Sequence, residues 1–208
     1  MLLQPNIYKV VGNRGCNCYV VESRSGLVII DVGLLGSDSA IKRYIELQLD
    51  SSLEDVTYII LTHGHRDVAE GLPDLLIYCP NAIVIMDGRE VEIVRKITYM
   101  TEDMEIMKIS DDTFIEDAGI HIIRTPGHTP GSISILYEKS LFIGGSIYIG
   151  PKGISLPRQN YDRGMLIESL KKLTNISFES IFPSHGRYIK SGAKTKFLDF
   201  LKTIAGTT

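Results

Sequence analysis

The sequence predicts an α/β protein. Short apolar runs rich in valine and isoleucine, which are typical of buried strands, recur along the 208 residues. Stretches with apolar residues at helical spacing lie between some of these runs. Strands mixed with helices in this way favour an α/β fold over an all-α or all-β one.

The expected elements can be given in chain order. Strands are expected at residues 18–21, 27–30, 57–61, 82–86, 120–123, 133–137, 141–143 and 181–182. Helices are expected at residues 39–49, 89–100, 165–173 and 194–204. Residues 144–160 contain four glycines and two prolines and therefore predict a long irregular loop. Loops of this kind often border active sites.

Composition limits the class of protein. A chain of 208 residues with 44% hydrophobic residues can bury a core without disulfides, and residues 1–208 are expected to form a single domain. The net charge of −3 and the scattered basic residues disfavour nucleic acid as a partner. No apolar run approaches the ~18 residues that a membrane span requires, so no membrane partner is expected.

The cysteines and the N-terminus bear on the compartment. The chain has three cysteines, and an odd number with Cys16 close to Cys18 and Cys79 alone is no disulfide framework. The first residues lack a basic start followed by an apolar stretch, so no signal peptide is indicated. These features favour a cytoplasmic location.

Histidines follow three of the expected strands. His63 and His65 come directly after one strand, and His128 and His185 come after two others. Ligands gather at the carboxyl ends of strands in α/β sheets, because the strands hold the departing loops rigidly. The spacing therefore predicts that all four histidines lie in one cleft.

Three of these histidines suit a catalytic metal. His63, His65 and His128 can form a face of three nitrogens that leaves zinc a fourth, open position for water. Zinc bound in this way lowers the pKa of its water to about 7 and supplies a zinc-bound hydroxide, so hydrolysis is the expected chemistry. His121 lies within an expected strand without a partner nearby in sequence, and we expect it to be a surface or half-buried side chain.

The segments around these histidines resemble the metallo-β-lactamase superfamily over nearly the whole chain. The matching segments are Ile-Ile-Asp-Val-Gly at 29–33, His-Gly-His-Arg-Asp at 63–67, Thr-Pro-Gly-His-Thr-Pro-Gly-Ser at 125–132 and Pro-Ser-His-Gly at 183–186. The resemblance implies an αββα sandwich, in which two mixed sheets are flanked by helices.

The resemblance also implies two sets of metal ligands. His63, His65 and His128 would hold a first metal, while Asp67, a histidine directly after it and His185 would hold a second, with an aspartate bridging the two. This chain departs from the pattern twice. It has Val68 at the position of that histidine and Gly145 at the position of the aspartate.

Both departures strike the second metal site. A second metal would keep only Asp67 and His185 as protein ligands, fewer than the three that catalytic zinc sites use. We therefore expect one zinc ion and a weak or absent second site, while the residues leave the choice between zinc, iron and manganese open. In that state Asp67 could accept a hydrogen bond from the zinc-bound water or act as a general base, and His185 could protonate a leaving group. Asp31 is expected to orient a ligating histidine.

The function expected from this pattern is hydrolysis of a small ester, thioester or lactone-like molecule. Similarity to hydroxyacylglutathione hydrolases favours thioesters, although the chain ends soon after His185 and leaves no room for the helical domain that grips glutathione in those enzymes. Lys152 and Arg158 in the expected loop could meet an anionic substrate, but solvated surface charges are the simpler interpretation.

A catalytically silent metal-binding or ligand-binding member of the superfamily is the alternative, because the missing aspartate could equally mark a loss of chemistry. A nuclease is disfavoured by the lack of a basic surface, and a di-iron oxygen-reducing protein is disfavoured by the missing carboxylate. The partner is expected to be a small molecule, and the sequence leaves the oligomeric state open.

Overall fold

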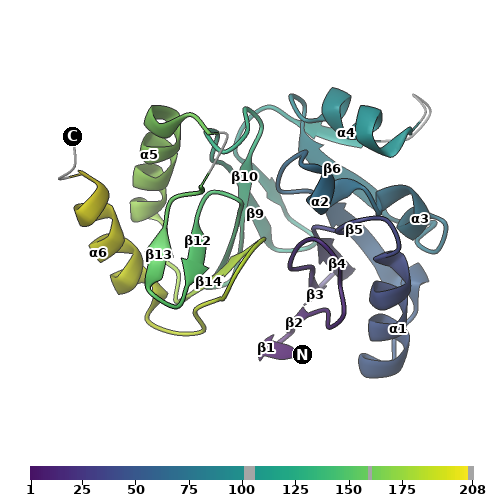
Figure 1. The fold of residues 1–208 in the computed structure, drawn as a ribbon. Coiled ribbons are helices and arrows are strands. Elements are labelled where there is room, and N and C mark those ends of the chain that lie inside the picture. Colours follow the sequence, from purple (N-terminus) through teal and green to yellow (C-terminus); the bar gives the residue numbers. More distant parts are fainter. Residues whose placement is uncertain (101–105, 159–160, 206–208) are drawn as a thin grey trace.

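The computed structural model describes residues 1–100, 106–158 and 161–205. Two β-sheets pack face to face, and helices cover the outer face of each sheet (Figure 1). This is the αββα sandwich, as the sequence predicted.

The first sheet comes from the N-terminal half of the chain and has seven strands within the described residues, side by side in sequence order. They are β1 (Leu2–Gln4), β2 (Ile7–Lys9), β3 (Tyr19–Ser23), β4 (Gly26–Ile30), β5 (Val56–Ile60), β6 (Ile83–Asp87) and β7 (Ile106–Ile109). Strands β1 to β4 pair antiparallel, and β4 to β7 pair parallel. The sheet is therefore mixed.

The second sheet has the strand order β14-β11-β10-β9-β8 within the described residues. Its strands are β8 (Thr113–Ile115), β9 (Ile120–Arg124), β10 (Ile133–Tyr137), β11 (Ser140–Gly144) and β14 (Ser180–Pro183). Because β10 runs antiparallel to β9 and β11, and β11 runs parallel to β14, the strands β9, β11 and β14 point the same way. Their carboxyl ends consequently meet at one edge of the sheet.

The helices complete the outer layers. Beside the first sheet lie α1 (Asp38–Gln48), α2 (Arg66–Ala69), α3 (Leu72–Leu76) and α4 (Val91–Thr98), together with the short 3-10 helix η1 (Leu53–Asp55). Beside the second sheet lie α5 (Arg163–Lys172) and α6 (Ala193–Ala205), with η2 (Leu173–Asn175) after α5. In Figure 1 the first group is on the right and the helices α5 and α6 are on the left.

Three apolar clusters hold the layers together. One lies between the first sheet and its helices and includes Ile45 and Ile59. The middle cluster lies between the two sheets, where Ile30 and Phe142 are both fully buried. The third joins the second sheet to α5 and α6. Burial of apolar surface in three successive layers is the main force that stabilises such a sandwich.

The expected strands and helices all appear, with boundaries shifted by two residues or fewer. The expectation of one irregular loop over residues 144–160 is wrong in part, because β12 (Tyr148–Gly150) and β13 (Gly153–Ser155) form a small hairpin there. Residues 159 and 160 lie outside the described residues. The glycines and the proline at the turn indicated a loop, and strands of only three residues are too short to show an alternating pattern.

No helix in the described part of the chain combines the length and the apolar character that a membrane span needs.

Candidate metal site

Three histidines meet where the two sheets come together. His63 and His65 follow β5 in the first sheet, and His128 follows β9 in the second. Their ring centroids form a nearly equilateral triangle with sides of 4.8, 4.7 and 4.7 Å. One nitrogen from each ring lies within 4.8 Å of the nitrogens of the other two. The structure thus brings together the three residues that the sequence placed around a first metal.

The state of these rings fits a metal. Within the part of the chain that the structure describes, His63 Nε2 and both ring nitrogens of His128 are buried without a hydrogen-bond partner. Buried polar atoms are seldom left unpaired, because this costs free energy. A divalent cation between the rings would satisfy them, since neutral imidazole nitrogens are good ligands for zinc.

Burial lowers the pKa values of two of the rings, those of His63 and His128. Burial lowers the pKa of His63 well below its usual value, and the neighbouring histidines lower it further. Burial likewise lowers the pKa of His128 to about 4, with smaller contributions from His65 and His185. Both side chains are therefore unprotonated at neutral pH, which is the form that binds a metal.

A hydrogen-bonded chain fixes the ring of His63. Its Nδ1 lies 2.9 Å from the hydroxyl of Thr62, and that hydroxyl donates to Asp31 Oδ2 over 2.9 Å. Asp31 Oδ1 accepts a hydrogen bond from the backbone N–H of Thr62 at 2.8 Å, and Ser184 donates to Oδ2 at 2.6 Å. Asp31 was expected to orient a ligating histidine, and the structure places the Thr62 hydroxyl between Asp31 and the His63 ring.

Asp31 itself is held in an unusual state. Its φ of +59° lies in the left-handed region, which costs a non-glycine residue about 1 kcal/mol or more. Burial raises its pKa to about 6, although the hydrogen bonds from Ser184 and Thr62 oppose this shift. Thr62 and Ser184 were missed in the sequence. The signal that could have found them is their place directly before His63 and His185.

Asp67 and His185 form a separate pair. His185 Nε2 lies 3.3 Å from Asp67 Oδ2, and both side chains are partly exposed. Burial lowers the pKa of His185, while the charge of Asp67 acts in the opposite direction. His185 lines the same cavity as His128, so the pair lies beside the histidine cluster.

The two changed positions offer no ligand to a second metal. Val68 is fully buried in α2, and its carbonyl accepts hydrogen bonds from the backbone N–H groups of Val32 and Gly33. A Cβ on Gly145 would lie 2.3 Å from Cδ2 and Nε2 of His128, far inside van der Waals contact. The ring of His128 therefore occupies the space in which a side chain at position 145 would begin.

Two cavities flank His128. One, of about 330 Å³, reaches His185 and Gly145 and is walled by Ile147, Tyr148, Pro157 and Arg158. The other, of about 340 Å³, lies toward α5 and is lined in part by Arg89 and Met165. The histidine cluster thus opens onto space large enough for a small organic molecule.

The remaining residues singled out in the sequence lie elsewhere. Lys152 lines a different cavity, against α6, so only Arg158 of the two basic residues lies beside the histidines. His121 is exposed and stacks on Phe114 with ring centroids 4.2 Å apart. The three cysteines are buried and unpaired.

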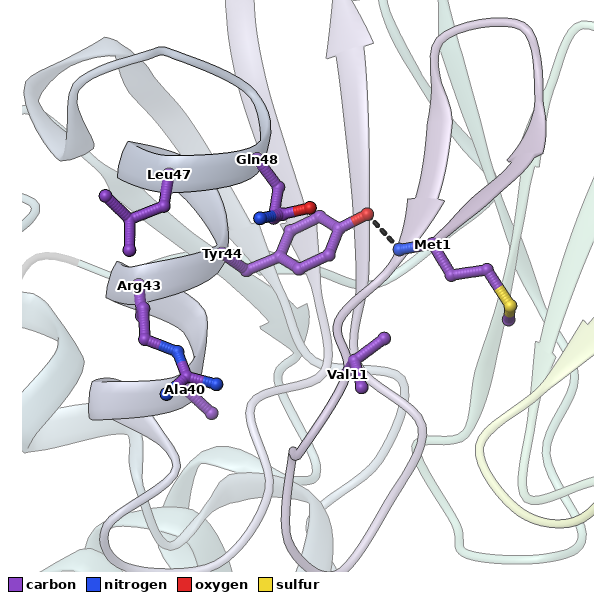
Figure 2. A pocket seen from close by; sticks show the side chains of 7 residues that line it. All are labelled: Met1, Val11, Ala40, Arg43, Tyr44, Leu47 and Gln48. Carbon is purple, nitrogen blue, oxygen red and sulfur yellow. Dashed lines mark hydrogen bonds between the residues drawn. The ribbon is translucent and has the colours of Figure 1, made fainter.

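A further hollow of about 310 Å³ lies between α1 and the N-terminal residues. Figure 2 shows Tyr44 reaching from α1 toward the amino group of Met1, to which it is hydrogen-bonded. Leu47 and Val11 line the same hollow, and it includes none of the histidines. It has no part in the candidate site.

Fold and site together define a class: an αββα sandwich with a three-histidine cluster suited to a divalent metal. A family model described as the metallo-beta-lactamase superfamily matches residues 11–185. The chain therefore belongs to the metallo-β-lactamase superfamily, whose members normally bind divalent metals.

Individual relatives agree with this membership. The chain is 29% identical over 203 residues to the probable metallo-hydrolase MJ0888 of Methanocaldococcus jannaschii, covering 89% of this chain and 93% of the relative. It is 25% identical over 172 residues to a hydroxyacylglutathione hydrolase of Buchnera aphidicola, covering 83% of this chain and 59% of that enzyme. The chain spans about half the length of several other curated relatives that it matches.

Solved structures show the same fold. The superfamily protein ST1585 of Sulfolobus tokodaii superposes with a TM-score of 0.71 at 21% identity, over 98% of this chain and 87% of that one. Superfamily membership supports metallo-hydrolase activity in general terms.

Proposed function

We propose that this protein is a mononuclear zinc hydrolase that acts on a small ester, thioester or lactone. The observation that carries the proposal is the triangle of His63, His65 and His128, with unpaired buried nitrogens next to an open cavity. Three protein ligands and an open side are the arrangement of catalytic zinc sites, whereas structural sites use four protein ligands.

His63, His65 and His128 would hold the zinc ion, which would polarise a substrate carbonyl and lower the pKa of water to about 7. Asp67 then accepts a proton from the attacking water, and His185 returns a proton to the leaving group. The separation of 3.3 Å between Asp67 Oδ2 and His185 Nε2 allows the proton to pass from one to the other. Because its pKa is lowered, a protonated His185 is a stronger acid than a solvent-exposed histidine.

A single ion is expected because the second site lacks ligands. Asp67 and His185 remain, but position 68 carries a buried valine and position 145 carries no side chain. Two close dications also repel each other strongly unless carboxylates offset their charge. The protein should therefore bind one zinc tightly.

The lining of the cavity beside His185 indicates the chemical class of the substrate. Ile147, Tyr148 and Pro157 provide largely apolar walls for an acyl group, and Arg158 adds a positive charge to the lining. Similarity to a hydroxyacylglutathione hydrolase supports thioesters among the candidates.

The test begins with metal content. Protein purified without added metal is analysed by plasma mass spectrometry, alongside His63→Ala and the matched control His121→Ala, which alters a histidine away from the cluster. We expect about one zinc per chain in the wild type and in His121→Ala, and none in His63→Ala. Two ions per chain would refute the single-metal proposal.

Activity is tested on the same samples with a nitrophenyl ester, an acyl thioester and a γ-lactone, with and without a chelator. Chelator-sensitive turnover that is lost in Asp67→Ala, while zinc stays bound, is the expected result. If the zinc-loaded protein hydrolyses none of the three, a silent metal-binding member of the superfamily is the better description.

A further inference from the structure

We propose that Glu90 is a positioning residue that clamps together the two loops carrying the histidine ligands. Its carboxylate Oε2 accepts a hydrogen bond from the backbone N–H of Gly64, between His63 and His65, at 2.7 Å. Its Oε1 accepts one from the backbone N–H of Gly131, three residues after His128, at 2.6 Å. One side chain thus bridges both halves of the proposed metal site.

The environment of Glu90 shows that these contacts are built in. The residue is 2% exposed, and a buried carboxylate is costly unless strong hydrogen bonds compensate for its lost hydration. Glu90 also occupies the N-cap position of α4, but its side chain makes no capping hydrogen bond to that helix. Its carboxylate serves the two loops instead.

The glycines at both ends of the clamp support this assignment. A Cβ on Gly64 would lie 2.6 Å from Glu90 Oε2, and a Cβ on Gly131 would lie 2.7 Å from Glu90 Cγ and Oε1. Neither glycine has a positive φ, so the backbone conformation does not require glycine at either position. The space for a side chain is instead taken by Glu90 together with Ile93 Cγ2, at 2.5 Å, beside Gly64, and by Glu90 together with Asp87 Cβ, at 3.0 Å, beside Gly131.

The expected consequence concerns metal affinity. The three imidazoles come from different sheets, and their convergence depends on how the two loops are placed relative to each other. Residues that orient the ligands by hydrogen bonds without touching the metal typically contribute 10- to 100-fold in metal affinity. This proposal rests on the proposed metal site at His63, His65 and His128.

The experiment measures the zinc dissociation constant by competition with a chelating dye. In Glu90→Gln the side chain keeps its shape, but its NH₂ group must face a backbone N–H, so one of the two hydrogen bonds is lost. Asp87→Asn is the matched control, because Asp87 is equally buried and lies three residues earlier, but its hydrogen bonds go to Arg124 and to Arg89. Gly131→Ala is the second test variant, since its methyl group would push Glu90 away.

We expect a dissociation constant about 10- to 100-fold higher in Glu90→Gln and Gly131→Ala, and within about threefold of the wild type in Asp87→Asn. Unfolding curves of the metal-free proteins show whether each variant is folded. Wild-type affinity in a folded Glu90→Gln would overturn the proposal, as would equal losses in Glu90→Gln and Asp87→Asn. If Glu90→Gln does not fold, wild-type affinity in Gly131→Ala would overturn it. If the wild type binds no zinc, both the proposed function and this proposal are refuted.

Discussion

At the scale of single residues, the site depends on side chains that do not touch the metal position. Thr62 links the strained, buried Asp31 to the ring of His63, and Ser184 brings the start of the His185 segment to the same carboxylate. Hydrogen bonds behind a ligand fix its ring orientation and its tautomer. Thr62 and Ser184 are therefore expected to affect metal affinity although neither is a proposed ligand.

Replacing Thr62 with valine tests this link. The substitution keeps the shape of the side chain but removes the hydroxyl, so we expect about 10-fold weaker zinc binding, measured by dye competition. Thr57→Val, on the strand β5 that precedes Thr62, is the control, because the Thr57 hydroxyl donates to Leu27 O and not to Asp31 or His63. Equal zinc affinity in Thr62→Val and the wild type would show that the Thr62 hydroxyl does not support His63.

Acid should destabilise the metal-free protein. His63 and His128 are neutral in the folded state because their pKa values are lowered, to about 4 for His128, whereas the unfolded chain takes up protons below about pH 6.5. The free energy of unfolding should therefore fall between pH 6.5 and pH 4. The raised pKa of Asp31, about 6, offsets part of this fall, because Asp31 takes up a proton in the folded state at a higher pH than in the unfolded state.

Denaturant unfolding at pH 7 and pH 5 in the presence of a chelator measures this loss. The contribution of His128 is on the order of 1–2 kcal/mol. A His128→Gln variant should lose less stability between the two pH values than the wild type. An identical loss in both would mean that His128 is not the group responsible.

At the scale of elements, helix α5 supports the loop that carries His128. Ser169 donates to the carbonyl of Pro126 at 2.6 Å, and the backbone N–H of Asp162 donates to the carbonyl of Gly127 at 2.8 Å. A Cβ on Gly127 would lie 2.4 Å from the backbone nitrogen of Leu166. The ligand loop and the first turns of α5 therefore pack backbone against backbone.

Comparing Gly127→Ala with Gly119→Ala distinguishes the cost of tight packing from the cost of a positive φ alone. Gly127 has a φ of +132° and no room for a methyl group, whereas Gly119 has a φ of +67° and nothing within 4 Å of its missing Cβ. We expect Gly127→Ala to lower the free energy of unfolding by about 2 kcal/mol or more and Gly119→Ala by about 1 kcal/mol. Equal losses in the two variants, measured with urea, would argue against tight packing on α5.

The elements also show what the sequence could predict. Long strands and amphipathic helices were found because burial imposes a regular spacing, as in α1, where Ile41, Tyr44 and Ile45 are the buried residues. Strands of three residues, such as β1, β2 and β8, are too short to establish a pattern. The histidines were found because their strands end beside them, but Glu90 was missed, since its partners are backbone groups far away in sequence.

At the scale of the whole molecule, the histidine cluster joins the two sheets. His63 and His65 come from the first sheet and His128 from the second, and other contacts across the same boundary include the hydrogen bond from the Tyr19 hydroxyl to the carbonyl of Pro183 at 2.7 Å. A metal bound by residues of both sheets stabilises the folded state, because the unfolded chain cannot hold the ligands together.

Removing the metal should therefore lower the melting temperature. Zinc at 100 times its dissociation constant contributes about 2.7 kcal/mol, which corresponds to a shift of roughly 5–10 °C in a chain of this size. Calorimetry with and without a chelator measures the shift. His128→Ala should melt at the same temperature in both conditions, and a chelator-dependent shift in that variant would place the stabilising metal elsewhere.

The division of the ligands between two sheets also sets an order of events during synthesis on the ribosome. The first sheet is made entirely from residues 2–109, so it can begin to pair while the rest of the chain is still being made. Of the three proposed ligands, the nascent chain then contains only His63 and His65, fewer than the three protein ligands of a catalytic zinc site. If the proposed site forms, we therefore expect it to bind its metal only after β9 and the segment to His128 have emerged.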